Sequence, residues 1–361
     1  MPPARSAKSP LRGSELGLDG KAWAPASPGG RLRTPSAKLP GATPAKAAPK
    51  FVSALDRLQK DAHASELDHT NTSPQFFLFL SLVQVPVALA VSFAVFPTGP
   101  FLNRFSYMAL GNYATHWLGF AIACLIDSAW HFDITEDIGY FANIYWSYTF
   151  IAGPPSPRQT LAYCMGLLWC VRICAFVGYR ILKRGSDFRF DKLAKAKAYQ
   201  LFGWTAGGTW CWANGFCLWY IADADQSTEL FGCASDYVGA SLFVFGILFE
   251  LAADVQKYRF NAAHKAGTNK QWIATGLWAR SRHPNYFGEN MLWLGVALLC
   301  MSGQSSAFAV GVCLVTPLFS FVFLLFTSLM LLEKRADARW GKNPKYLEYK
   351  ATTPVWLPRL F

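Results

Sequence analysis

Eight segments of apolar residues follow one another along most of the chain. They cover residues 76–96, 107–126, 138–153, 160–180, 200–221, 237–253, 285–301 and 308–332. About 20 apolar residues form a helix long enough to cross a bilayer, and most of these segments approach that length. The segments at 138–153 and 285–301 are short or polar, so the pattern predicts about six to eight spans. We therefore expect an all-α, polytopic transmembrane helix bundle.

The composition favours a membrane protein over a nucleic-acid-binding protein. Of the 361 residues, 52% are hydrophobic and 16% are aromatic, with 14 Trp and 29 Phe, which is typical of polytopic membrane proteins. The formal net charge is +12, but the basic residues lie in the N-terminal tail and in loops beside apolar segments, as in the cytosolic loops of membrane proteins. No nucleic-acid partner is expected.

The loops and the N-terminal region predict how the chain is organised. Residues 1–70 are rich in Pro, Ala, Ser, Lys and Arg, so we expect a disordered tail before an integral membrane domain at 71–361. The loops at 181–199 and 254–284 are basic and the loop at 222–236 is acidic. This alternation predicts that the basic loops and both tails are cytosolic. The expected location is the endoplasmic reticulum or another endomembrane, with a plastid as the alternative.

The nine cysteines carry no sign of a metal site or a disulfide framework. They fall almost entirely within apolar segments, without paired CxxC spacing or accompanying histidines. Such residues usually pack between helices. No metal is therefore expected.

One polar stretch stands out at the start of the seventh apolar segment. Arg280, Arg282 and His283 precede Pro284, a residue favoured in the first turn of a helix. The free amide donors of a helix start, with two guanidinium groups beside them, form an anion site. Asn285 and Glu289 lie four residues apart on one face of that helix. Glu289 is then an ionisable group at or below the membrane interface, and such groups are usually functional.

This stretch resembles a known group of membrane enzymes. The sequence Arg-His-Pro-Asn-Tyr-Phe-Gly-Glu at 282–289, with blocks at 127–130, 169–172 and 254–257, is similar to the steroid 5-alpha-reductase C-terminal superfamily, and most similar to a branch of uncharacterised membrane proteins. That group is related to sterol C14-reductases and isoprenylcysteine methyltransferases. The resemblance covers residues from about 110 to 361. It implies a helical membrane fold in which NADPH enters from the cytosol between the last helices.

The resemblance also implies which residues contact the cofactor. By position they are Lys257, Trp278, Arg282, His283, Asn285, Tyr286, Glu289, Asp337 and Tyr346. The spacing after Asp337 is shorter than in the sterol C14-reductases, so Tyr349 is an alternative to Tyr346. Where those enzymes often have Gln-Lys-x-x-Phe-Arg, this chain has Gln-Lys-Tyr-Arg-Phe-Asn at 256–261, so the second cation has moved or is lost.

These residues suit an NADPH-dependent reductase that acts on a carbon–carbon double bond of a lipid. The cofactor carries about four negative charges, and outside a Rossmann fold its cations must come from loops. We expect Tyr286 and Glu289 to be catalytic. Other candidates for the proton donor are Tyr145, Tyr148 and His131. The acidic cluster from Asp127 to Asp137 is first interpreted as an ion-pair scaffold facing Arg172 or Arg180, and second as catalytic.

Other interpretations remain open from the residues alone. Asn285 can instead make an interhelical hydrogen bond, and Glu289 a structural ion pair with Arg282. A methyltransferase using S-adenosylmethionine, acting on a lipid or prenyl group, is the alternative enzyme. A cofactor of that kind has no phosphates and would not need so many guanidinium groups. A non-catalytic membrane scaffold is the third hypothesis.

Overall fold

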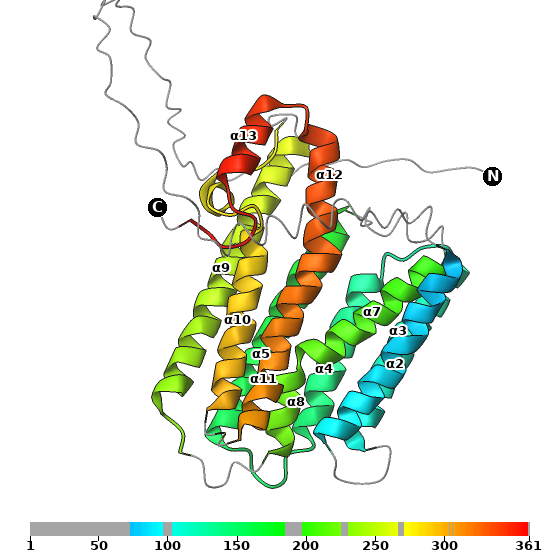
Figure 1. The fold of residues 1–361 in the computed structure, drawn as a ribbon, viewed down its shortest axis with the longest axis vertical. Helices are drawn as coiled ribbons and strands as arrows, with labels where there is room; N and C mark the ends of the chain where they lie inside the picture. Colours follow the sequence, from blue (N-terminus) through cyan, green and yellow to red (C-terminus); the bar gives the residue numbers. More distant parts are fainter. Residues whose placement is uncertain are drawn as a thin grey trace, which may run out of the picture. The chain divides into compact units, whose positions relative to one another are not determined.

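The apolar segments fold into helices, as Figure 1 shows. The computed structural model describes residues 73–96, 103–184, 197–224, 230–265, 271–302, 304 and 306–359. The predicted tail at 1–70 lies outside them. The helices are α2 (Pro74–Val95), α3 (Arg104–Ile126), α4 (Phe132–Tyr148), α5 (Pro157–Arg184), α7 (Lys197–Asn214), α8 (Phe216–Asp223), α9 (Ala234–Lys265), α10 (Pro284–Met301), α11 (Ala307–Phe323), α12 (Met330–Trp340) and α13 (Pro344–Thr352). The described residues contain no strand, which confirms the all-α prediction.

Five helices are long and apolar enough to cross a membrane. They are Pro74–Val95, Arg104–Ile126, Pro157–Tyr179, Ala234–Ala263 and Ala307–Trp340. This number, obtained for the described residues, is lower than the six to eight expected, because α4, α7 and α10 are shorter or more polar. Those three helices nevertheless pack against the five. Large apolar side chains such as Leu118 and Leu125 are 64% and 85% exposed, as expected for surfaces that face lipid. The chain is therefore a multi-pass membrane protein.

Some boundaries differ from the predicted ones. α9 continues to Lys265, well past the predicted end at 253, so Lys257 lies on a helix and not in a loop. The segment at 200–221 is interrupted at Gly215, between α7 and α8. The last apolar segment passes through a π-helical stretch, η3 (Leu324–Leu329), and continues as α12. That helix ends at Trp340, before Gly341, and α13 begins at Pro344.

α9 and α10 form the closest helix pair, because glycines let their backbones touch. A Cβ atom at Gly246 would lie 2.4 Å from the backbone nitrogen of Leu292, and one at Gly288 would lie 2.7 Å from that of Glu250. Gly239 and Gly295 make the same kind of contact. Small residues at such positions allow close packing of membrane helices. The helix that carries the candidate site is therefore fixed against the helix that carries Lys257.

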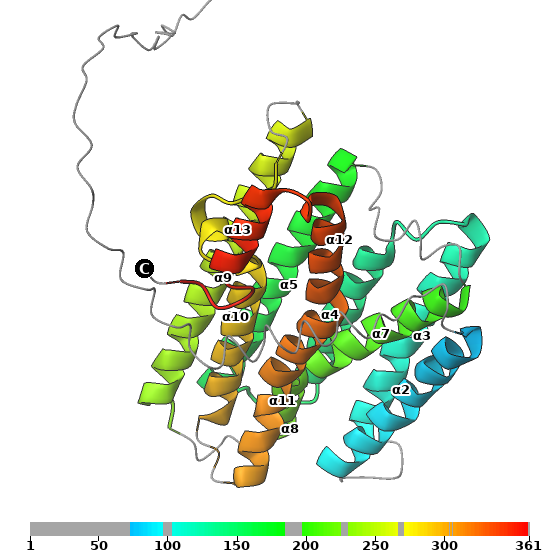
Figure 2. The same cartoon turned by 45° about the horizontal axis from the view of Figure 1, so that its top comes forward.

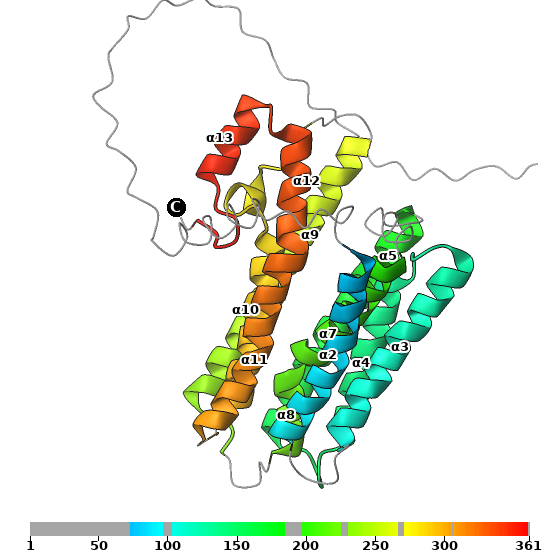
Figure 3. The same ribbon diagram turned by 45° about the vertical axis from the view of Figure 1, so that its right-hand side comes forward.

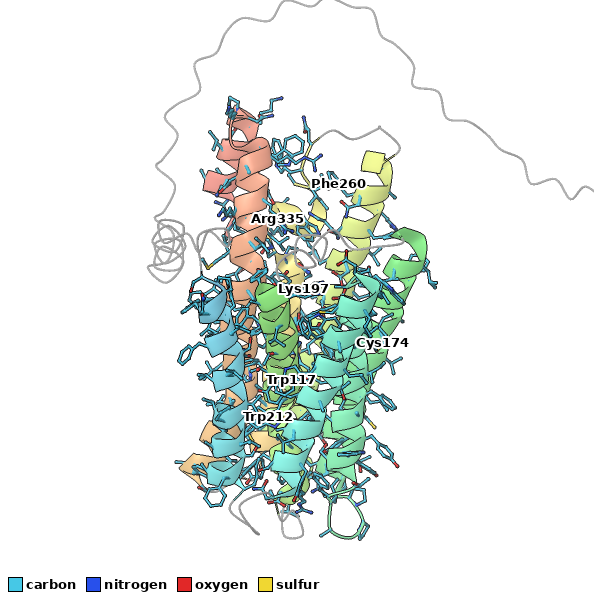
Figure 4. The ribbon with its side chains drawn as sticks, turned by 90° about the vertical axis from the view of Figure 1, so that its right-hand side faces the viewer. Trp117, Cys174, Lys197, Trp212, Phe260 and Arg335 are labelled. Carbon is cyan, nitrogen blue, oxygen red and sulfur yellow. The ribbon has the colours of Figure 1, made fainter. Side chains whose placement is uncertain are left out.

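The helices form two groups that meet along the middle of the bundle. In Figure 3, α9, α10 and α11 lie together, and α2, α3, α4 and α7 lie together beside them. α13 and the C-terminal segment lie at the end of the bundle where α10 begins (Figures 1 and 2). In Figure 4, Arg335 and Phe260 lie towards this end, while Trp117 and Trp212 lie deeper. We call this polar end the cap; it consists of residues 271–283, α12, α13 and residues 353–359.

Candidate functional site at the cap

The loop before α10 is held by the end of the chain. The backbone nitrogens of Arg282 and His283 donate to the carbonyl oxygens of Pro354 at 2.8 Å and Val355 at 3.1 Å. The nitrogen of Arg359 donates to the carbonyl oxygen of Arg280 at 2.9 Å. α10 itself begins at Pro284, as predicted. The C-terminal segment therefore fixes the position of the two residues that precede the helix.

The Arg282 side chain is buried, and each of its two terminal nitrogens has a partner. Its Nη1 donates to the carbonyl oxygens of Lys350 at 2.6 Å and Thr353 at 2.8 Å. Its Nη2 lies 2.9 Å from Oε2 of Glu333, and Nε2 of His283 lies 2.8 Å from the other oxygen of Glu333. The alternative interpretation, an ion pair between Arg282 and Glu289, is therefore wrong. The partner is Glu333, at the start of α12.

A cavity of about 300 Å³, here called the cap cavity, lies beneath this network. Its walls include Asp254, Lys257, Trp272, Trp278, Arg282, His283, Asn285, Tyr286, Glu333, Tyr346 and Tyr349. The ammonium group of Lys257 lies 4.3 Å from the centre of the Trp278 ring, and it makes no ion pair with the described residues. Trp278 is held in place because its Nε1 donates to the carbonyl oxygen of Ala253 at 3.0 Å. Lys257 is therefore the cation that this cavity presents most freely.

Two tyrosines of α13 complete the walls of the cap cavity. The hydroxyl of Tyr346 donates to Asp337 at 3.0 Å, and that of Tyr349 donates to the carbonyl oxygen of Trp278 at 2.7 Å. Burial raises the pKa of both phenols above the usual value, so both remain neutral at physiological pH. Asp337 also binds Lys350 at 2.6 Å. It is not among the cavity walls and acts on the cavity by holding Tyr346.

A second cavity, of about 420 Å³, lies deeper between the helices and is here called the inner cavity. It shares Phe176, Asp254, Asn285 and Tyr286 with the cap cavity. Its carboxyl groups come from α4, α9 and α10, and they are Asp133, Glu136, Asp137, Glu250, Asp254 and Glu289. Its aromatic side chains include Phe132, Tyr140, Trp169, Tyr199, Phe202, Trp210 and Phe323. The two cavities are therefore neighbours that meet at the first turn of α10.

The residues at the junction have defined surroundings. The Tyr286 ring stacks on the His283 ring, with 5.6 Å between centroids. Oδ1 of Asn285 is buried and accepts no hydrogen bond from the described residues. Arg172 of α5 binds Glu250 at 2.5 Å and also Asp254, so it anchors the wall of the inner cavity from behind. Arg172 was expected to face the acidic cluster from Asp127 to Asp137. It pairs instead with Glu250 and Asp254 of α9. The side chain of Arg180 lies outside the described residues.

The comparisons with known proteins show a family but assign no activity. The family described as "Protein of unknown function (DUF1295)" matches residues 119–353. The chain belongs to the DUF1295 family. An uncharacterized protein of Schizosaccharomyces pombe is 30% identical over 95 residues, which is 22% of this chain and 27% of the relative. No solved structure matches. Because the DUF1295 match extends from α3 to the end of α13, it includes every residue that lines the two cavities.

Most of the predicted site residues of this DUF1295 chain come together. Lys257, Trp278, Arg282, His283, Asn285, Tyr286 and Tyr346 line the cap cavity, and Glu289 lines the inner one. Asp337 lies behind Tyr346. Three candidate proton donors lie elsewhere: Tyr145 and Tyr148 are 61% and 44% exposed, and His131 bonds to the carbonyl oxygen of Gly119. Of the proposed donors, only Tyr286 lines the cap cavity or the inner cavity.

Sequence reasoning missed several residues of the site, of which three are the most informative. Glu333 pairs with Arg282 and His283, Trp272 lines the cap cavity, and Tyr140 lines the inner one. Glu333 had a usable signal, since it is the first charged residue after a long apolar segment and two buried cations need a carboxylate. Tyr140 had none, because one more tyrosine in an apolar helix is indistinguishable from a core residue.

Proposed function

We propose that this protein is a membrane-embedded oxidoreductase that uses NADPH to reduce a carbon–carbon double bond of a lipid. The proposal is supported by the resemblance of residues 282–289 to the steroid 5-alpha-reductase superfamily. The observation that carries it is the meeting of a polar cavity at the cap with an aromatic cavity between the helices. A hydride donor and an apolar acceptor must approach each other, and two cavities that share a wall allow that.

The cap cavity has groups that fit the cofactor. Lys257 offers an ammonium group for a phosphate, and Trp272 and Trp278 offer ring surfaces for stacking. The unpartnered Oδ1 of Asn285 can accept a hydrogen bond from the nicotinamide carboxamide. Arg282 contributes positive charge, although backbone carbonyls and Glu333 already occupy its terminal nitrogens.

The reaction divides between the cofactor and the protein. When bound, NADPH would supply the hydride for one carbon of the double bond and would be oxidised to NADP⁺. The other carbon needs a proton. Tyr286 lines both cavities and is stacked on His283, so its phenol is placed to give that proton. Glu289 lines the inner cavity and would orient the acceptor or pass a proton to Tyr286.

The charges of the two cavities also suit a methyltransferase, which is therefore the second candidate function. S-adenosylmethionine carries a positive sulfonium group, and the inner cavity is rich in carboxyl groups. The cap cavity also presents fewer free guanidinium groups than the sequence indicated, because Arg282 is neutralised by Glu333. Both enzymes would act on a lipid that enters from the bilayer.

The sidedness of the membrane also belongs to this proposal. The ends of α5, α9 and α12 that carry basic residues lie at the cap end of the bundle (Figure 1). Basic loops tend to be cytosolic, which would open the cap cavity to soluble cofactors. We propose an endomembrane, the endoplasmic reticulum first, with the cap in the cytosol.

A titration of the purified chain tests the function. We expect NADPH to bind, and Lys257→Met to weaken its affinity about tenfold to a hundredfold, because a charged hydrogen bond to phosphate is lost while packing on Trp278 is kept. Lys345→Met is the matched control, since Lys345 is exposed on α13 outside the cavity. S-adenosylmethionine is titrated in parallel. Binding of that compound without NADPH binding would replace the reductase with the methyltransferase.

A further inference from the structure

The inner cavity reaches the surface of the bundle between α7 and the long helix formed by α11, η3 and α12. Thr327 of η3 lines the cavity and is exposed at the surface. On the opposite side, Phe202 and Ala206 of α7 line the cavity and are half-buried. Leu331 of α12, one turn beyond Thr327, lines it as well. We call this opening the side mouth; it is bordered by these four residues.

The two helices meet below the side mouth and separate towards the cap. The centroid of the Trp210 ring on α7 lies 4.8 Å from that of the Phe323 ring on α11. About two turns nearer the cap, the Phe202 ring packs against Phe77 of α2, with 5.7 Å between centroids. Figures 1 and 2 show α7 leaning away from α11 and α12 in this direction. The side mouth therefore lies where the two helices diverge from a shared contact.

The side mouth opens within the apolar part of the bundle. Thr327 lies inside the helix Ala307–Trp340, which is long and apolar enough to span a membrane. The outer face of that helix carries Leu318, Val322 and Phe326, which are 60%, 48% and 55% exposed. They follow one another at four-residue intervals, so they form one apolar stripe that ends beside Thr327. Surfaces of this kind face lipid, so the mouth opens towards hydrocarbon chains.

The lining of the side mouth is apolar, whereas the carboxyl groups of the inner cavity come from α4, α9 and α10 on its other walls. The apolar side chains on the walls formed by α7 and the long helix are Phe202, Ala206, Trp210, Phe323, Leu324 and Leu331. The hydroxyl of Thr327 donates to the carbonyl oxygen of Phe323 at 2.6 Å, so its own helix satisfies this polar group. A hydrocarbon chain can pass such a lining without leaving a buried polar group unpaired.

The helix on one side of the mouth has an unusual geometry. At the end of η3 the backbone nitrogen of Met330 donates to the carbonyl oxygen of Leu325, five residues earlier. Such π-helical stretches are rare and occur frequently at functional sites. Three of the six residues of η3 line the inner cavity, and they are Leu324, Thr327 and Ser328. The local change in helix geometry therefore coincides with the side mouth.

We propose that the side mouth is the portal through which the hydrocarbon chain of a bilayer lipid passes into the inner cavity. The chain enters between Phe202 and Thr327 and lies against Trp210 and Trp169. It thus reaches the wall that the two cavities share by a route separate from the cap. That this lipid is a substrate rests on the proposed function, whereas passage of the chain requires no cofactor.

A buried tryptophan reports whether a hydrocarbon chain reaches the cavity. Trp169 lines the inner cavity and is 4% exposed. The full chain, in nanodiscs of phosphatidylcholine, is mixed rapidly with 1-bromododecane, whose bromine quenches tryptophan fluorescence only at short range. The emission of Trp169 is obtained as the difference between the parent and Trp169→Phe. We expect Trp169 to lose most of its emission, at a rate that depends on the width of the side mouth.

Two variants change that width in opposite directions. Thr327→Phe narrows the mouth and should slow the quenching of Trp169 several-fold, and Leu331→Ala widens it and should speed the quenching. Both should change the rate more than the final extent of quenching, because a portal governs access. Val322→Phe is the matched control, because Val322 is close in size to Thr327, lies on the outer face of the same helix and lines neither cavity. It should keep the rate of the parent.

An unquenched Trp169 in the parent, or equal rates in Thr327→Phe and Val322→Phe, would overturn the portal. If Thr327→Phe does not fold, Leu331→Ala decides, since a rate equal to that of the parent overturns it too. The NADPH titration of the same preparations separates this inference from the proposed function. Quenching that depends on the mouth without NADPH binding rejects the reductase alone. NADPH binding with quenching that ignores the mouth rejects the portal alone.

Discussion

The cap cavity and the inner cavity share four residues but balance their charges in different ways. At the cap, Glu333 is surrounded by Arg282, His283 and Lys350, at 2.9, 2.8 and 3.9 Å. At the inner cavity one cation pairs with two carboxylates, because Arg172 binds both Glu250 and Asp254, and Glu289 lines the same cavity. Cations gathered around a carboxylate stabilise a fold. Glu289 in the inner cavity forms no ion pair with a described residue, and an ionisable group within a membrane protein is usually functional.

The largest expected effect comes from removing the carboxylate at the centre of the cap. Glu333→Ala leaves Arg282 and His283 buried without their anion, which should lower the free energy of unfolding by about 3–5 kcal/mol. Thermal melting in detergent measures this loss of stability. Glu333→Gln, which keeps an acceptor, should lose less, and Glu348→Ala on the exposed side of α13 should lose almost nothing. If Glu333→Ala melts like the parent, the cap is held by the C-terminal backbone contacts instead.

The second effect concerns the helix pair that supports both cavities. Gly246→Ala places a methyl group 2.4 Å from the backbone of Leu292, which forces α9 and α10 apart. Such overpacking should cost about 1–3 kcal/mol and should weaken ligands of both cavities together. Gly311→Ala is the matched control, because a Cβ there has no neighbour within 4 Å, and it should be neutral or slightly stabilising. Equal melting temperatures of the two variants would show that α10 can shift without a loss of stability.

The helices of this bundle were readable from the sequence because apolar length and proline position act locally. Pro284 starts a helix where predicted, and the eight apolar segments each became helical. The end of α9 was not readable, because Asp254 to Lys265 leave the apolar pattern while the backbone continues as a helix. Charged residues such as Lys and Arg form helices well, so a change in polarity does not mark a helix end.

The site could be predicted only in part, because its pairings join residues far apart in the chain. The block at 282–289 and Lys257 were found from motif and charge. The bond of His283 to Glu333 spans 50 positions, and that of Arg282 to Thr353 spans 71. Such contacts depend on how α12 and α13 return over α10. The same reason hid the inner cavity, whose carboxyl groups come from three helices.

The smallest effect distinguishes the two tyrosines that the sequence left as alternatives. Tyr346→Phe removes the hydrogen bond to Asp337, but Asp337 keeps Lys350, so the free energy of unfolding should fall by only about 1 kcal/mol. Tyr349→Phe leaves the carbonyl oxygen of Trp278 without that donor and should cost a similar amount, while also loosening the ring that Lys257 contacts. NADPH affinity should therefore fall more in Tyr349→Phe than in Tyr346→Phe, with exposed Tyr145→Phe as the control in both assays. The opposite order would mean that Asp337, through Tyr346, shapes the cap cavity more than Trp278 does.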